Sequence, residues 1–308
     1  MTRIVRVGGA QMGPVARSDT KERTVERLIA LLRAAHGRGC ELVVFPELAL
    51  TTFFPRWYAE PGEMDGYFET EMPGPATRPL FEEARRLGVG FYLGYAELSV
   101  QAAGARRFNT SILVDGSGVI VGKYRKIHLP GHSDYENERR HQHLEKRYFE
   151  VGDTGFRVWD AFGGRVGMAI CNDRRWVETY RVMGLQDVEI ILIGYNTPAA
   201  DSLSDEPEEL RMFHNHLTMQ AGAYQNSTWV VGVAKAGIED GHRLIGGSAI
   251  IAPTGEIVAQ ASTDADELIV ADCDLDRCHY YRANIFNFAR HRRPEFYQRI
   301  VSQAGADR

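Results

Sequence analysis

The chain has 308 residues, of which 44% are hydrophobic and 25% are charged, and its formal net charge is −5. This composition is typical of a globular protein and excludes a disordered chain, while the negative charge argues against a nucleic-acid-binding surface, which normally has a basic excess. No segment approaches the ~18 apolar residues of a membrane span and the first residues do not resemble a secretory signal, so we expect a soluble cytoplasmic protein with no membrane or nucleic-acid partner.

Strand-like and helical segments alternate along the first half of the chain. Apolar runs at 2–12 and 40–47 are predicted as strands, and apolar residues recur at helical spacing over 20–39 between them. This order is typical of a βαβ unit. A second helix is predicted next, then a strand, and finally a β-hairpin that turns at a Gly-rich segment; these elements span 76–88, 89–98 and 108–126.

The same alternation resumes after residue 160. Strands are predicted over 164–173, 188–196, 228–237 and 267–275, with a second hairpin over 248–260. Helices are predicted over about 176–185 and 207–225, and from about 275 to the C-terminus.

The two hairpins share one sequence pattern. Residues 248–260 match residues 111–123 at a constant offset of 137, which pairs Ser111 with Ser248 and Gly118 with Gly255. Two similar halves with alternating strands and helices predict an α/β fold of two mixed sheets packed face to face, with helices on the outer faces, which is an α-β-β-α sandwich. Because no Pro- or Gly-rich linker separates the halves, we expect a single domain over 1–308.

The four cysteines are expected to be reduced thiols, since they are few and nothing indicates export. Cys273 and Cys278 lack a second pair or a histidine at zinc-ligand spacing, so core packing is the better interpretation. His141 and His143 form the alternative metal-binding pair, but no carboxylate or cysteine completes a known spacing. We expect neither a metal nor another cofactor.

Three unusual polar residues follow apolar strands: Glu47 in "LVVFPEL", Lys126 in "VGKYRKIHLPG" and Cys171 in "GMAICNDRRW". Ends of strands are where α/β proteins build their sites. Taken singly, these residues are more often a surface carboxylate, a solvated lysine and a packed thiol. Together they supply a base, a cation for an oxyanion and a nucleophile, which is the set needed for covalent acyl transfer.

The motifs that contain these residues resemble the Glu-Lys-Cys triad of the nitrilase superfamily, the carbon-nitrogen hydrolases. "ELALTTFFPRW", "RKIHLPGH", "HLEKRYFE", "CNDRRW" and "GYNTP" are similar to the N-carbamoyl-D-amino acid amidohydrolases, from residue 1 to about 300. The resemblance implies an α-β-β-α sandwich, no cofactor, a small-molecule substrate and association into homo-dimers or tetramers.

The resemblance also implies a role for individual residues. Cys171 would attack the carbamoyl carbon, Glu47 would take and return a proton, and Lys126 would stabilise the oxyanion. Glu145 matches the additional active-site glutamate. His128 and His143 match histidines of the substrate pocket. Nitrilases have Cys-Trp-Glu and carbamoylputrescine amidases have Cys-Trp-Asp at the nucleophile, whereas here Asn172 follows the cysteine, so nitrile hydrolysis is not expected.

Arg174 and Arg175 indicate an anionic substrate. A guanidinium can hold a carboxylate with two hydrogen bonds, and an N-carbamoyl amino acid has a free carboxylate near its ureido group. Neighbouring side chains point in different directions, so we expect one arginine to face the substrate and the other to be structural, with Arg175 preferred for the substrate. The alternative is that one of the two forms a structural ion pair with Asp173 or Glu178. Substrate-binding residues are then expected to include both arginines and five further residues: Asn172, His128, His143, Asn196 and Thr197.

The expected reaction is hydrolysis of an N-carbamoyl-D-amino acid to the D-amino acid, carbon dioxide and ammonia through an acyl-enzyme. The preference for the D-enantiomer follows from the resemblance alone. One alternative is an amidase or a β-ureidopropionase-like carbamoylase that acts on another small amide or acid. The other is a catalytically inactive binding protein of the same fold, against which the intact Glu47, Lys126 and Cys171 argue.

Overall fold

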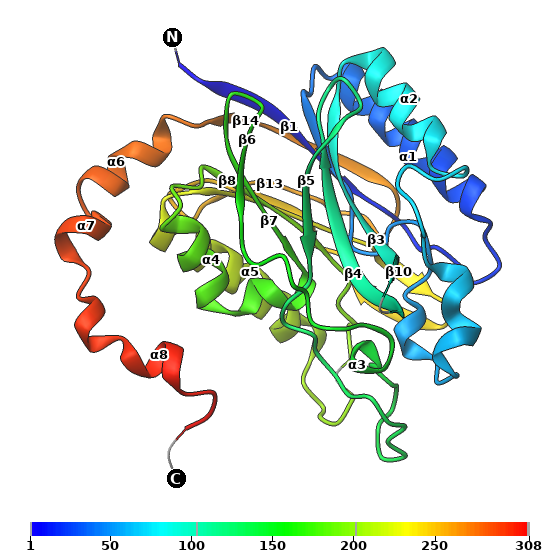
Figure 1. Cartoon of the computed structure of the whole chain (residues 1–308). Coiled ribbons are helices and arrows are strands. Elements are labelled where there is room, and N and C mark those ends of the chain that lie inside the picture. Colours follow the sequence, from blue (N-terminus) through cyan, green and yellow to red (C-terminus); the bar gives the residue numbers. More distant parts are fainter. Residues whose placement is uncertain (1, 103, 201, 307–308) are drawn as a thin grey trace.

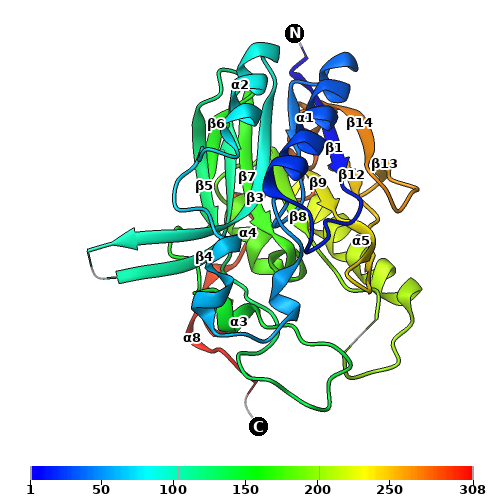
Figure 2. The ribbon, with the colours of Figure 1, turned by 90° about the vertical axis from the view of Figure 1, so that its right-hand side faces the viewer.

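Two six-stranded β-sheets lie face to face in the computed structural model, which describes residues 2–102, 104–200 and 202–306 (Figure 1). The first sheet has the order β14-β1-β2-β3-β4-β5. Its strands are β1 (Ile4–Gln11), β2 (Leu42–Val44), β3 (Gly90–Gln101), β4 (Gly104–Val114), β5 (Ile120–Arg125) and β14 (Glu267–Asp274). In Figure 2 the far part of the β3–β4 hairpin projects from the body of the molecule.

The second sheet has the order β13-β12-β9-β8-β7-β6. Its strands are β6 (Val158–Ala161), β7 (Gly164–Ile170), β8 (Ile190–Tyr195), β9 (Trp229–Ala234), β12 (Ala249–Ile251) and β13 (Ile257–Gln260). A separate two-stranded ribbon consists of β10 (Ala236–Glu239) and β11 (His242–Ile245). The ribbon and the short strand β6 were not predicted from the sequence.

Both sheets repeat one topology, as the hairpin match predicts. β1, β2 and β3 are parallel and are followed by antiparallel β4 and β5. In the same way, β7, β8 and β9 are parallel and are followed by antiparallel β12 and β13. The register shifts between Leu113 and Val114 in one hairpin and between Ile250 and Ile251 in the other, which are positions related by the same sequence offset.

Helices cover the outer face of each sheet, which confirms the α-β-β-α sandwich (Figures 1 and 2). α1 (Lys21–Gly37) and α2 (Arg78–Leu87) pack on the first sheet, and α4 (Val177–Gly184) and α5 (Glu208–Asn226) pack on the second. Thr20 caps the start of α1, because its hydroxyl accepts a hydrogen bond from the Arg23 amide at 3.2 Å. None of the described helices is both long and apolar enough to cross a bilayer.

The space between the sheets is filled by one apolar core with side chains from both halves of the chain. The Tyr92 hydroxyl spans this space. It donates to the Ala169 carbonyl at 2.9 Å and accepts from the Gly194 amide at 3.1 Å. Because both partners lie on the opposite sheet, Tyr92 fixes the spacing of the sheets next to the ends of β7 and β8.

The single C-terminal helix expected from residue 275 is wrong. The segment forms three short helices, α6 (Arg277–Ala283), α7 (Phe288–His291) and α8 (Gln298–Ser302), and lies along one side of the body (Figure 1). Asn287 caps the start of α7 through a hydrogen bond from the Arg290 amide, and Pro294 lacks the amide needed to continue a helix. The apolar side chains of this C-terminal segment pack little against the rest of the chain, and Val301, for example, is 83% exposed.

Two glycines let the segment that carries Glu47 pass between the sheets. A Cβ on Gly94 of β3 would lie 2.7 Å from the Glu47 Cα atom, and a Cβ on Gly194 of β8 would lie 2.5 Å from the Glu47 amide nitrogen. No side chain fits at these distances, so the glycines determine how deeply Glu47 lies.

We therefore expect Gly194→Ala to lower the free energy of unfolding by about 1–3 kcal/mol, because the added methyl group must displace the backbone at Glu47. Urea denaturation measures this loss. Gly66→Ala is the matched control, since nothing lies within 4 Å of a Cβ there, and it should leave stability nearly unchanged. Equal stability of the two variants would show that the contact at Gly194 relaxes without cost.

Candidate active site

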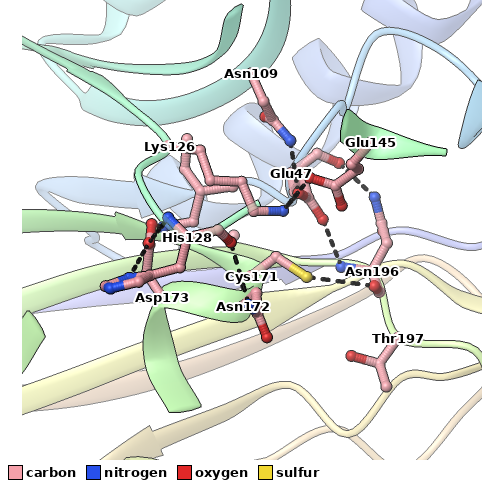
Figure 3. A network of polar contacts seen from close by, with 12 residues as sticks. Glu47, Asn109, Lys126, His128, Glu145, Cys171, Asn172, Asp173, Asn196 and Thr197 are labelled. Atoms are coloured by element: carbon pink, nitrogen blue, oxygen red, sulfur yellow. Dashed lines mark hydrogen bonds and ion pairs between the residues drawn. The ribbon is translucent and has the colours of Figure 1, made fainter. Parts of the chain in front are cut away.

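Glu47, Lys126 and Cys171 converge at the ends of three strands (Figure 3). Glu47 follows β2, Lys126 follows β5 directly, and Cys171 follows β7 directly. All three side chains are buried. A thiol and two carboxylates, those of Glu47 and Glu145, lie within 4.8 Å of one another. The structure therefore brings together the four residues that the sequence assigned to catalysis.

The Lys126 ammonium lies between two buried carboxylates. Its Nζ atom donates to Glu47 at 2.8 Å and to Glu145 at 2.6 Å. Burial lowers the pKa of Lys126, but its electrostatic interactions with Cys171, Glu145 and Glu47 outweigh this effect and raise the pKa above its ordinary value. Burial likewise raises the pKa of Glu145, while Lys126 and His143 outweigh it and lower this pKa. Both groups are therefore charged at neutral pH.

Two asparagines fix the orientation of Glu47. The Asn109 amide donates to Oε1 at 2.8 Å, and the backbone N–H of Asn196 donates to Oε2 at 3.0 Å. The side-chain amide of Asn196 also donates to the Glu47 carbonyl at 2.9 Å. Asn109 was not identified from the sequence, although an amide within the apolar strand segment 108–114 was an available signal. With these bonds, the carboxylate is held in one position before any substrate binds.

The backbone at Cys171 has a left-handed conformation with φ of +47°, at the start of a 3₁₀ turn over Cys171–Arg175. Asp173 stabilises this sharp turn. Its carboxylate accepts hydrogen bonds from the Ile170 amide at 3.0 Å and the Tyr124 hydroxyl at 2.7 Å, and from both the amide (3.0 Å) and the ring Nδ1 (2.9 Å) of His128. The bonds to Asp173 hold the thiol at the end of its strand despite the strained backbone.

The thiol of Cys171 points toward Asn196 and donates to its carbonyl oxygen at 3.5 Å. Burial raises the pKa of Cys171 to about 11, assisted by the charge of Glu47 and opposed by Lys126 and Arg174. The free thiol is therefore protonated at neutral pH. A nearby base must take its proton during nucleophilic attack, and Glu47 is positioned for this step.

The two arginines after the cysteine have different environments, as expected. Arg174 is fully buried and Arg175 is exposed. Arg174 donates to the Cys171 carbonyl and to Thr197 Oγ1, both at 2.7 Å, and to Asn215 Oδ1 at 2.8 Å. The alternative of an ion pair with Asp173 or Glu178 is not present for Arg174 among the described residues, because the Asp173 carboxylate is bound by other donors and the guanidinium of Arg174 binds neutral acceptors.

Arg175 has no hydrogen-bond or ion-pair partner in the described parts of the chain. Although solvent reaches its side chain, the surrounding protein and the charge of Arg174 lower its pKa to about 10. An unpaired guanidinium beside a second cation favours binding of an anion.

The other predicted pocket residues are also close to the triad. His143 contacts Glu145 at 3.1 Å. The amide of Asn172 donates to the His128 carbonyl at 3.2 Å. The hydroxyl of Thr197 accepts from Arg174, so it supports the site within the protein. One buried polar atom near the thiol, Asn196 Oδ1, has no partner among the described residues.

The residues considered for a metal lie in other surroundings. Cys273 and Cys278 are buried in the core between the sheets, as the packing interpretation predicts, and the Cys278 thiol donates to the Glu189 carbonyl at 3.4 Å. His143 belongs to the catalytic network, while the His141 ring lies 6.0 Å from the ring of His242. At the triad, Lys126 is the cation that joins the two carboxylates.

Comparison with known proteins identifies the family. The model of the carbon-nitrogen hydrolase family matches residues 6–283, and the chain belongs to this family. An N-carbamoylputrescine amidase from Solanum lycopersicum is 30% identical over 316 residues, covering 99% of this chain and 97% of the relative. A nitrilase from Pyrococcus abyssi is 32% identical over 299 residues, covering 96% and 100%. A carbon-nitrogen hydrolase from Helicobacter pylori has the same fold, with a TM-score of 0.84, 23% identity, and coverage of 98% and 99%.

The chain is therefore a hydrolase of the nitrilase superfamily that acts on C–N bonds of amides. This confirms the superfamily and the reaction class expected from the motifs.

The raised pKa of Cys171 gives a pH-dependent prediction. Because the thiolate is the reactive form, the rate of alkylation of Cys171 by iodoacetamide should rise about tenfold per pH unit from pH 6 to 9 without a plateau. Mass spectrometry of the peptide that contains Cys171 measures this rate. A plateau below pH 8 would mean that the thiolate already predominates there, against the raised pKa.

Proposed function

We propose that this enzyme hydrolyses N-carbamoyl-D-amino acids to the D-amino acid, carbon dioxide and ammonia, with Cys171 as nucleophile. One observation carries the substrate class: two arginines without a carboxylate partner in the described chain follow the nucleophile by three and four residues, and Nη1 of the first, Arg174, lies 3.7 Å from the Cys171 sulfur. A substrate with a free carboxylate complements this charge, whereas the cationic amine of N-carbamoylputrescine does not. The D-preference rests on the resemblance of the motifs.

The hydrogen bonds of Glu47 support an ordered sequence of steps. Glu47 takes the thiol proton as the sulfur of Cys171 forms a bond to the ureido carbon. Protonation neutralises Glu47 and leaves Lys126 paired only with Glu145, so the ammonium becomes available to stabilise the oxyanion. The protonated Glu47 then gives its proton to the departing nitrogen.

Water completes the reaction. Glu47, once more a carboxylate, accepts a proton from the water molecule that attacks the thioester, and the thiol of Cys171 is regenerated. The unpartnered Oδ1 of Asn196 supplies an acceptor for an N–H group of the ureido substrate. Either C–N bond can be cleaved first in this scheme, and the two orders give the same final products.

We also propose that residues 1–308 act as one domain in the cytoplasm and form homo-dimers or tetramers. The shared core between the sheets supports the single domain, and the free cysteines suit a reducing compartment. Exposed apolar residues on α4 and α5, among them Val177 and Phe213, support association through this face. Sedimentation velocity tests the assembly, and a monomer at micromolar concentration would contradict it.

Release of ammonia from three ureido compounds tests the proposed substrate. N-carbamoyl-D-phenylalanine should be hydrolysed faster than its L-enantiomer, and N-carbamoylputrescine should be the poorest substrate. Cys171→Ala should abolish turnover, with a loss of about 10⁴-fold, while Cys40→Ala keeps most activity. Preference for N-carbamoylputrescine would favour the amidase alternative.

Arg175 tests recognition of the carboxylate. Arg175→Ala should lower kcat/KM for N-carbamoyl amino acids by roughly 2–5 kcal/mol, because the substrate carboxylate loses its partner. The loss should be much smaller for the analogue in which the carboxylate is a neutral amide. Stability should be unchanged, since Arg175 is exposed and has no partner within the described chain. Equal losses on the acid and the amide would refute its role in carboxylate binding.

A further inference from the structure

Arg174 is a buried cation whose hydrogen-bond partners are all neutral. Its guanidinium binds Asn215, Thr197 and the Cys171 carbonyl, and no carboxylate of the described chain forms an ion pair with it. Another buried arginine of the chain, Arg56, is paired with the Glu239 carboxylate at 2.9 Å. An unpaired buried charge destabilises a fold. The charge at this position is therefore compensated by no carboxylate of the described chain, only by neutral groups and the Tyr195 ring, which lies 4.4 Å from the guanidinium carbon.

The charges around the thiol of Cys171 explain why a cation is placed at position 174. Lys126 is bound by two carboxylates, those of Glu47 and Glu145, so these three groups together have one net negative charge. That charge opposes formation of a thiolate. Arg174 Nη1 lies 3.7 Å from the Cys171 sulfur, and its positive charge offsets that net negative charge. Arg174 is thus a cation in contact with the sulfur whose charge no carboxylate of the described chain cancels.

We propose that Arg174 is a catalytic residue that stabilises the thiolate of Cys171 while the thiol proton moves to Glu47. The electron pair left on sulfur then forms the bond to the substrate carbon. This role rests on the proposed nucleophile and differs from substrate binding, which is left to Arg175. Burial raises the pKa of Cys171, and the charges of Lys126 and Arg174 act in the opposite direction.

Asn215 on α5 allows the charge to be tested without removing the arginine. Its Oδ1 accepts from Arg174 Nε, and its Nδ2 donates to the Tyr195 hydroxyl at 3.1 Å. Asn215→Asp has nearly the same shape and places a carboxylate against the guanidinium. The Tyr195 hydroxyl, which now donates to the Gly246 and Gly247 carbonyls, can turn its proton to the new carboxylate instead. The substitution cancels the charge of Arg174 but keeps its position and the access to the thiol.

The rate of Cys171 alkylation by iodoacetamide at pH 8 should fall about tenfold or more in Asn215→Asp, because the thiolate loses a compensating charge. The free energy of unfolding should stay equal or rise, since a neutral bond becomes an ion pair. Gln220→Glu adds a carboxylate to the same helix, where its amide binds the Gly255 carbonyl instead, and it should alkylate within twofold of the wild type. A merely structural Arg174 predicts an unchanged rate in both variants.

A folded Asn215→Asp variant that alkylates at the wild-type rate would overturn the role of Arg174. A second pair of variants covers the case in which Asn215→Asp does not fold. Arg174→Lys keeps the charge and should alkylate at least fivefold faster than Arg174→Gln, as roughly expected from one compensating charge; equal rates would overturn the proposal. Alkylation requires no substrate, so these outcomes do not depend on the substrate class. Retained hydrolysis by Cys171→Ala would instead refute the nucleophile itself.

Discussion

The site depends on one interaction, the burial of the Lys126 ammonium between the carboxylates of Glu47 and Glu145. An isolated charge would be far too costly to bury, but here each charged group has a partner at hydrogen-bond distance. The arrangement places the ammonium between the two carboxylates, and all three side chains are buried. It also holds a base and a cation in fixed positions, so little reorganisation is needed when charge moves during the reaction.

The fold supplies this geometry through the ends of its strands. β2, β5 and β7 end close together because the two sheets face each other across one common apolar core. Each of these strands is followed, at once or within three residues, by one of the residues assigned to catalysis. Gly94 and Gly194 leave room for the segment of Glu47. The strained backbone at Cys171 is held by the hydrogen bonds of Asp173, so stability elsewhere compensates for strain at the nucleophile.

The sequence predicted the two-halved sandwich because strand and helix periodicity and the repeated hairpin are local signals. It also placed Glu47, Lys126 and Cys171, since each follows an apolar strand. It did not predict the partners that orient them. Asn109 is 62 positions from Glu47, and Asn215 is 41 positions from Arg174, so only tertiary packing brings these pairs together.

The C-terminal segment was overpredicted as one helix because its polar and aromatic residues have acceptable helix propensity, whereas Asn287 and Pro294 interrupt the hydrogen-bonding pattern.

The unusual charges around the thiol have a chemical interpretation. Lys126, with both carboxylates, is prepared for the oxyanion, and Arg174 is placed for the thiolate. With the proposed roles, Arg174 at the thiolate and Arg175 at a substrate carboxylate, the two arginines that follow the cysteine each have a chemical reason.

Rapid-quench mass spectrometry with an N-carbamoyl amino acid is the most direct test of the proposed chemistry. The wild type should show a transient adduct on the peptide that contains Cys171, and the mass of the adduct identifies which nitrogen leaves first. In Glu47→Gln the same adduct should form about 100-fold or more slowly, because the proton acceptor is missing. An adduct on another residue, or formation at the wild-type rate in Glu47→Gln, would contradict the assignment of nucleophile and base.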